Sequence, residues 1–589
     1  MMDWNGAAGN PATNPPSGYC THVSNLFLPW HRPYLAVYEQ ILVQNAVDIA
    51  NEFQGSDQQR YRDAAATLRI PYWDWAAPQN GGNTVPDVLV QNQISVNTPS
   101  GQQTIENPLY SYKFTKSTQN LVYSPFASWT QTYRNPVSQD NPTQNNDQGV
   151  IDTMNGQQSS LASRLFNLFA NYNNFAQVSN EAWAQGQQGS YDSIESIHDT
   201  IHGLFGGANN GDMSIIDVSA FDPAFWLHHT MVDRFFAMWQ ALYPDTYVDP
   251  AAQTYGNYWY APGTQMDANS PLVPFHSDTA GNFHTSNSVR DHTRFGYTYP
   301  EITGNVQDIV SAVNRLYGAG QPQAGNKKRS PVLPDITGIL TEVGDAVTDA
   351  LGPVGDIVED VAADTTDLVS DINGYLGIIS PRDYIVNVRT DKNALDGSYQ
   401  IYVFCGDVPE DRNEWAGSDT LVGIQAITSM KQGYQMGPAI VAGTIPLTKY
   451  LEKHVVLNAL AGLSEDLVIP YLTDNLTWRV IGVRIPCILL TRISALTDHT
   501  ELRRGSPRLR NARPQARSRI RGQEANQVSH RLPTMGRWLH QPLRSHERQG
   551  RRLVRVGRGL GLWEDQYTHK GAKQELRVYL FLNVTIVNK

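Results

Sequence analysis

Two short stretches decide the fold of this chain: residues 198–202 read HDTIH, and residues 222–234 read DPAFWLHHTMVDR. On a helix, His198 and His202 are four residues apart and lie on the same face. The second stretch offers Asp222 as an N-cap and a proline at the first helical position, and apolar residues recur behind it at helical spacing. The pattern predicts two helices of a bundle that direct imidazoles toward one point.

Three neutral imidazoles that converge in this way can bind one metal ion. This donor set suits copper, zinc, iron or nickel and argues against magnesium or calcium, which prefer oxygen ligands. Adjacent helical residues point about 100° apart, so only one of His228 and His229 can face the ion. Asp233 could orient a histidine ring by accepting its second N–H, or could simply pair with Arg234 or a neighbouring helix.

A second cluster lies near the start of the chain, where residues 18–35 read GYCTHVSNLFLPWHRPYL. It brings Cys20, His22 and His31 close together in the sequence. With both clusters in one fold, imidazoles can converge on a pair of metal ions.

These stretches resemble fungal tyrosinases, which belong to the coupled binuclear (type 3) copper proteins. The resemblance is strong over residues 1–305 and moderate over about 380–482. It implies a mainly α catalytic domain, with a four-helix-bundle dicopper core and long loops, followed by an antiparallel β domain. It also implies an enzyme that uses two copper ions and dioxygen to oxidise o-diphenols to o-quinones. True tyrosinases first hydroxylate monophenols, and a melanin or pigment pathway is the implied setting.

The resemblance assigns three histidines to each copper ion. The matching ligands of the second ion (CuB) are His198, His202 and His229, whereas His22 and His31 match the second and third ligands of the first ion (CuA). Cys20 stands where fungal tyrosinases form a thioether, which implies a Cys20–His22 crosslink. Its alternative role is that of a small buried hydrophobic residue.

The first CuA ligand of the family pattern has no counterpart, because no histidine precedes His22. We interpret this as an N-terminal truncation that leaves the CuA site incomplete. No secretory signal is visible, so the expected location is cytoplasmic or undetermined. Two alternatives stay open, namely a catalytically impaired remnant and a haemocyanin-like dioxygen binder. The Cys-x-His pattern at Cys20 favours the enzyme.

Three further residues match family positions near the substrate. Glu195 matches a carboxylate that orients a water, and it could equally be an ordinary first-turn helix acid. Asp199 follows the first CuB histidine, where asparagine is a common choice in monophenol-active members. An ionised aspartate cannot donate an amide N–H, which predicts a high ratio of diphenol to monophenol activity. Phe225 matches a bulky residue over CuB, or belongs to the core.

The composition of the chain limits the classes of partner that we expect it to bind. The net charge of −11 over 589 residues argues against nucleic-acid binding, and no run of eighteen apolar residues predicts a membrane span. Three cysteines are too few for a disulfide scaffold. The expected partners are phenolic small molecules and dioxygen, and the oligomeric state is left open.

Four segments follow from the pattern along the chain. Residues 1–305 form the catalytic domain, which closes with FGYTYPE at 295–301, and residues 306–380 form a linker with amphipathic helices. Residues 381–482 show strand periodicity and resemble the domain that keeps family members latent until it is cleaved. Residues 483–589 are interpreted as a disordered or irregular, wrongly translated tail, since residues 503–558 contain 16 arginines and no lysine. A genuine basic tail for an acidic partner is the alternative.

Overall fold

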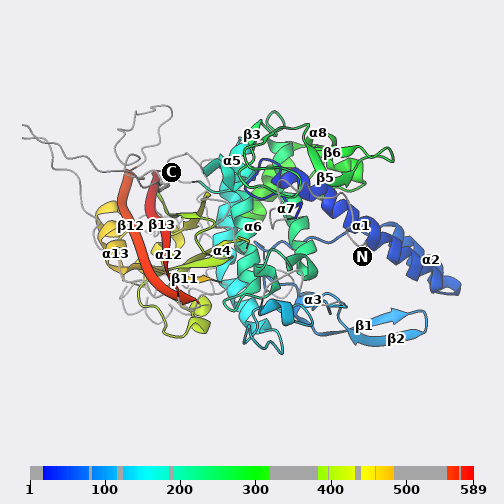
Figure 1. Ribbon diagram of the computed structural model, residues 1–589, viewed down its shortest axis with the longest axis horizontal. Coiled ribbons are helices and arrows are strands. Elements are labelled where there is room, and N and C mark those ends of the chain that lie inside the picture. The colour runs from blue at the N-terminus through cyan, green and yellow to red at the C-terminus, as the bar shows by residue number, and fades with distance from the viewer. Residues whose placement is uncertain are drawn as a thin grey trace, which may run out of the picture.

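The protein is described by a computed structural model that covers residues 18–77, 82–115, 124–184, 191–318, 382–395, 397–430, 439–457, 459–482, 554–569 and 572–588. A helical unit occupies the centre and right of Figure 1, and a β unit lies against it on the left. The predicted amphipathic helices of the linker and the arginine-rich stretch fall mostly outside the described residues. None of the helices in the described ranges is long and apolar enough to cross a membrane.

Four long helices form the helical unit: α1 (Phe27–Glu52), α4 (Asp147–Asn171), α6 (Ile194–Gly206) and α7 (Ala224–Leu242). Helix α6 packs against α4 and α7, and α1 packs against α7. One hydrophobic core runs through all four, which confirms the expected mainly α architecture. Two further helices flank them, with α2 (Gly55–Ala66) beside α1 and α9 (Val306–Tyr317) against α4 and α7.

Local chemistry fixes the ends of the two histidine-bearing helices. Ser193 caps α6 by accepting the N–H of Ser196 at 3.1 Å. Helix α6 ends at Gly206 and is capped by Gly207, whose φ of +73° suits glycine. Helix α7 starts one residue later than the sequence predicted, yet Asp222 still accepts the N–H of Ala224 at 2.9 Å.

Short elements join the long helices. They are the helices α3 (Asp87–Val90), α5 (Phe175–Ser179) and α8 (Ser286–Val289), the strand pairs β1 (Gln93–Thr98) with β2 (Gly101–Glu106), β3 (Ala251–Ala252) with β4 (Gln265–Met266) and β5 (Pro271–His276) with β6 (Phe283–Thr285), and the 3₁₀ turns η1 (Phe126–Ser128), η2 (Glu181–Ala184), η3 (Asp212–Ser214), η4 (Ser219–Phe221) and η5 (His292–Phe295).

The β unit contains two antiparallel sheets, which confirms the predicted antiparallel β domain. One has the order β11-β8-β9, with β8 (Tyr399–Cys405), β9 (Leu421–Ile427) and β11 (Leu476–Gly482). The other contains β7 (Arg382–Asp391) paired with β10 (Ile440–Pro446), in register at Val388 and Gly443. The 3₁₀ turn η7 (Arg412–Gly417) and the helices α12 (Thr448–Val456) and α13 (Glu465–Asn475) complete the unit.

Strand β8 is buried along its whole length because both of its faces are covered. Ile401 and Val403 belong to the core of the β unit, whereas Tyr402 and Phe404 belong to the core of the helical unit. Its neighbour β9 packs directly on α6. The sheet thus covers the outer side of α6, and all thirteen residues of that helix are buried.

Two segments near the end of the chain form strands, which the prediction of an irregular tail did not include, whereas residues 483–553 lie outside the described residues. Residues Val554–His569 and Ala572–Asn588 form strands β12 and β13, and β13 pairs with β7 in antiparallel register at Val584 and Val386. An open strand edge offers unpaired backbone groups, and β13 occupies that edge of β7. Residues 572–588 are rich in β-branched and aromatic residues, a strand signal that the arginine count upstream obscured.

Candidate metal centre

Helices α6 and α7 bring three imidazoles together at one point. The Nε2 atoms of His198 and His202 are 3.1 Å apart, those of His198 and His229 are 3.2 Å apart, and those of His202 and His229 are 3.4 Å apart. Imidazole nitrogens bind metals of this class at about 2.0–2.1 Å, so three of them around one ion must lie a little over 3 Å apart. The triangle has the size and the donor type of a three-histidine metal site.

The Nδ1 atoms of these rings lie on the side away from the triangle, and their contacts favour metal binding through Nε2. His202 directs Nδ1 at the carbonyl oxygen of Met213 at 2.7 Å, which leaves the Nε2 lone pair free for an ion. His198 Nδ1 lies 3.1 Å from Asp199 Oδ1. Burial lowers the pKa of all three rings below the ordinary histidine value, which keeps them neutral as ligands must be.

His228 lies beside this triangle, and one of its ring nitrogens is within 4.8 Å of a ring nitrogen of each of the other three histidines. Its ring stacks on that of His198 at a centroid distance of 5.1 Å. It is fully buried, and neither of its nitrogens has a hydrogen-bond partner among the described residues. His229 of the adjacent pair completes the triangle, and the expectation that only one of the two faces an ion stays a prediction.

Asp233 does not orient a histidine ring. Its Oδ1 accepts from Arg32 Nε at 2.7 Å, and its Oδ2 accepts the hydroxyls of Tyr297 and Tyr299 at 2.6 and 2.7 Å. The suggestion that it accepts a histidine N–H is therefore corrected: the carboxylate ties α1 and the Tyr-x-Tyr segment to α7. The alternative, pairing with a neighbouring helix, describes its role.

The first cluster lies where the chain enters α1. His22, His31 and Cys20 offer donor atoms that all lie within 4.8 Å of one another. His31 directs Nδ1 at the carbonyl oxygen of Phe27 at 2.7 Å, and its Nε2 lies 3.3 Å from Cys20 Sγ. Burial lowers the pKa of His31 to about 4 and raises the pKa of the Cys20 thiol.

The two clusters face each other. The rings of His31 and His229 stack at 4.8 Å, and the ring of His22 is 5.8 Å from that of His198. Rings of the two clusters therefore contact each other. The sulfur of Cys20 contacts His31 in this arrangement, and the Cys20–His22 crosslink stays a prediction.

The remaining predicted site residues also lie at this place. The ring of Phe225 stacks on His229 at 4.0 Å. Glu195 accepts the backbone N–H groups of Val23 and Glu181 at 2.7 and 2.8 Å. Burial raises the pKa of Glu195 to about 7. Through its hydrogen bond to Val23, Glu195 links α6 to the loop that carries His22.

Asp199 has partners that the sequence did not reveal. Its Oδ2 accepts from Lys392 Nζ at 2.8 Å and from the backbone N–H of Thr428 at 3.0 Å, both from the β unit. The same ammonium donates to Glu181 Oε2 at 2.7 Å. Glu181 and Lys392 lie 211 residues apart, and neither falls in a motif with a chemical signature, so their pairing could not be predicted from the sequence.

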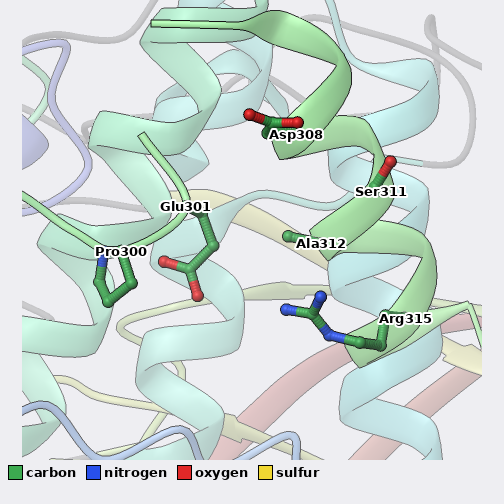
Figure 2. A pocket seen from close by; sticks show the side chains of 6 residues that line it. All are labelled: Pro300, Glu301, Asp308, Ser311, Ala312 and Arg315. Atoms are coloured by element: carbon green, nitrogen blue, oxygen red, sulfur yellow. The ribbon is translucent and has the colours of Figure 1, made fainter. Parts of the chain in front are cut away.

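A pocket elsewhere on the helical unit has a different character (Figure 2). Pro300 and Glu301 face four residues of α9 across it, namely Asp308, Ser311, Ala312 and Arg315. Glu301 already accepts from Arg234 Nη2 at 2.5 Å, and Arg234 also donates to Asp74 and Tyr317. None of the lining residues belongs to a histidine cluster, and Glu301 has a structural role.

Comparisons with known proteins agree with both units. Residues 2–242 match the family model of the common central domain of tyrosinase, and residues 383–494 match that of the tyrosinase C-terminal domain. The tyrosinase of Neurospora crassa is 30% identical over 553 residues, which cover 81% of this chain and 80% of that protein. The tyrosinase of Podospora anserina is 32% identical over 504 residues, which cover 78% and 86%.

A comparison with a solved structure agrees with these sequence matches. The structure of latent and active mushroom tyrosinase superposes with a TM-score of 0.63 at 26% identity, and the match covers 82% of this chain and 81% of that one.

Proposed function

The chain belongs to the tyrosinase family of copper oxidoreductases, and on that basis we propose that it oxidises o-diphenols to o-quinones with dioxygen. In the balanced reaction, two diphenols each lose two electrons and two protons, and one dioxygen is reduced to two waters. The observation that carries the proposal is the triangle of Nε2 atoms, 3.1–3.4 Å on each side, facing a second cluster that contains two more histidines.

The residues present fit copper. His198, His202 and His229 would hold one ion, and His22 and His31 would hold the other. All five rings are buried enough that their pKa values fall below the ordinary value, as neutral ligands require. Bound copper would supply dioxygen activation and a Lewis-acid centre for the phenolic oxygen.

The protein's own side chains would position the phenol and handle its proton. Phe225, stacked on His229, gives the substrate ring an aromatic wall. Glu195 uses one lone pair of each oxygen for a backbone N–H and retains others, so it could hold a water that takes the phenolic proton. With its pKa near 7, this carboxylate is matched to proton exchange at neutral pH.

Hydroxylation of monophenols, entry into a pigment pathway and the Cys20–His22 thioether are finer parts of the same proposal. They rest on the family resemblance. Asp199 bears on the first of them, because it occupies the position next to His198 and carries a carboxylate rather than an amide.

Oxygen uptake tests the proposal. The purified chain, assayed in buffer with excess copper, should consume oxygen when 4-methylcatechol is added. The uptake should disappear with a chelator and in His202→Ala. Equal uptake with and without copper, or in the variant, would rule out this function for the site.

A further inference from the structure

A buried ion cluster joins the β unit to the helical unit beside the histidines. Lys392, directly after β7, extends its ammonium between Glu181 and Asp199, with Nζ–O distances of 2.7 and 2.8 Å. The three side chains are 0–1% exposed. Within the described ranges, no other lysine or arginine forms an ion pair with either carboxylate.

The carboxylates need a cation at this place. Burying an unpaired carboxylate is costly, and here a third one, Glu195, lies close enough to influence Glu181 electrostatically. Glu181 Oε1 is buried and has no hydrogen-bond partner among the described residues, so the ion cluster keeps a free acceptor even with the lysine present. The occupying lysine and the free acceptor both point to a positively charged, multiply donating ligand.

The ion cluster adjoins the histidines that would bind metal. Asp199 binds the ammonium through Oδ2, and its Oδ1 lies 3.1 Å from His198 Nδ1. The Nε2 atom of the same ring belongs to the triangle. One carboxylate and one imidazole ring therefore separate the ammonium from the place where a phenol would react.

We propose that Glu181 and Asp199 form an ammonium-binding subsite, which Lys392 fills while the β unit is in place and which the amine of an amine-bearing phenol fills once that unit has moved away. The identity of the aromatic part rests on the proposed function. Lys392 is an internal stand-in for the ammonium group of the substrate, and the β unit and the substrate compete for one site. The subsite favours catechols with an alkylammonium chain as substrates over neutral catechols. It disfavours catechols that carry a carboxylate.

Chemical rescue tests the subsite without metal or turnover. Lys392→Ala removes three methylenes and the ammonium, which n-propylammonium replaces atom for atom. The variant should unfold at a lower temperature than the parent chain. Propylammonium should then raise its Tm in a saturable way, by roughly 2–4 °C at about ten times the dissociation constant. n-Butanol, which is neutral, and butyrate, which is negatively charged, should not raise the Tm.

Two variants serve as controls. Lys453→Ala removes a lysine that is 61% exposed and lies 4.0 Å from an exposed aspartate, so propylammonium should not change its Tm. The rescue should also vanish in Lys392→Ala combined with Glu181→Gln. An equal response in Lys453→Ala, or a rescue that survives Glu181→Gln, overturns the subsite. If Lys392→Ala does not fold in plain buffer, refolding yield with each additive replaces Tm, with the same expected order.

Substrate preference tests the second half of the proposal. In copper-loaded protein cleaved within residues 318–330, kcat/KM for 4-(2-aminoethyl)catechol should exceed that for 4-methylcatechol by about tenfold, the worth of one partly desolvated ion pair. Glu181→Gln should bring the ratio toward one. If both catechols are oxidised and Glu181→Gln leaves the ratio of their kcat/KM values unchanged, the proposed substrate class is overturned. Failure of both to react counts against the proposed function instead, and the metal-free rescue still decides the subsite.

Discussion

The two histidine clusters differ in how firmly the fold holds them. The second cluster places three imidazoles on α6 and α7, and its Nε2 atoms converge to within 3.4 Å. The first cluster offers two imidazoles and a thiol, and two of these three donors, Cys20 and His22, precede the first turn of α1. Helices fix side-chain directions more tightly than the loop before a helix does. The second cluster is therefore the better preorganised metal site.

The largest expected effect comes from removing a ligand of the second cluster. His202→Ala should lower catechol oxidation by more than about 100-fold, because even the loss of an outer partner of a metal ligand costs about 10–100-fold. Copper content should fall in parallel. His276→Ala is the matched control, since this exposed histidine lies outside both clusters. If activity survives in His202→Ala, the second cluster is not the preorganised site.

The next effect concerns Glu195, which connects the two clusters through the N–H of Val23. Burial raises its folded pKa from 4.5 to about 7, so the folded state binds the proton more tightly than the unfolded state. Its contribution to stability is then full below about pH 4.5 and is lost as pH rises through 7, by up to roughly 3 kcal/mol.

Denaturant unfolding of the metal-free chain from pH 5 to 7.5 measures this. The parent chain should lose stability over that range relative to Glu195→Gln, whose amide does not titrate. Parallel curves for the two proteins would show that Glu195 titrates normally and does not couple the clusters in this way.

A third effect follows from the cover on α6. The β8–β9 sheet packs on the helix that carries His198 and His202, and Lys392 reaches Asp199 beside them. Cleavage within residues 318–330, which belong to the segment predicted as a linker, should free the β unit to leave and raise catechol oxidation about tenfold. Cleavage at an inserted site in the exposed turn at Thr98–Gly101 should leave the rate unchanged. The same rate before and after linker cleavage would contradict the shielding.

The smallest effect separates two activities at the second cluster. In the cleaved protein, Asp199→Asn should raise monophenol hydroxylation several-fold relative to catechol oxidation, because it removes a negative charge beside the phenol and adds an N–H donor. Initial rates on both substrates measure the ratio. An unchanged or lower ratio would remove this role from Asp199.

The sequence predicted those parts of the site that depend on local spacing. The interval between His198 and His202, and the Asp222–Pro223 helix start, were sufficient to predict α6, α7 and the convergence of three rings. The partner of Asp233 could not be predicted, because Arg32 reaches it from another helix.

The long-range pairs show the same limit. Lys392 contacts Glu181 where the β unit packs on the helical unit, and no sequence period or motif encodes that contact. The prediction of an irregular tail rested on the arginine count of residues 503–558, which lie before β13, although the residues of β13 themselves favour a strand. Periodicity predicts elements and their faces, whereas contacts between buried charges depend on how the elements pack.

Copper content after mild dialysis tests the contrast between the clusters most directly. The chain is loaded with excess copper, dialysed, and analysed for metal per protein beside His202→Ala and His22→Ala. Three converging imidazoles should retain their ion and the weaker cluster should lose its own, which gives nearer one copper than two per chain. His202→Ala should retain close to none, and His22→Ala should match the parent chain. Two coppers held equally firmly, or retention in His202→Ala with loss in His22→Ala, would contradict the account.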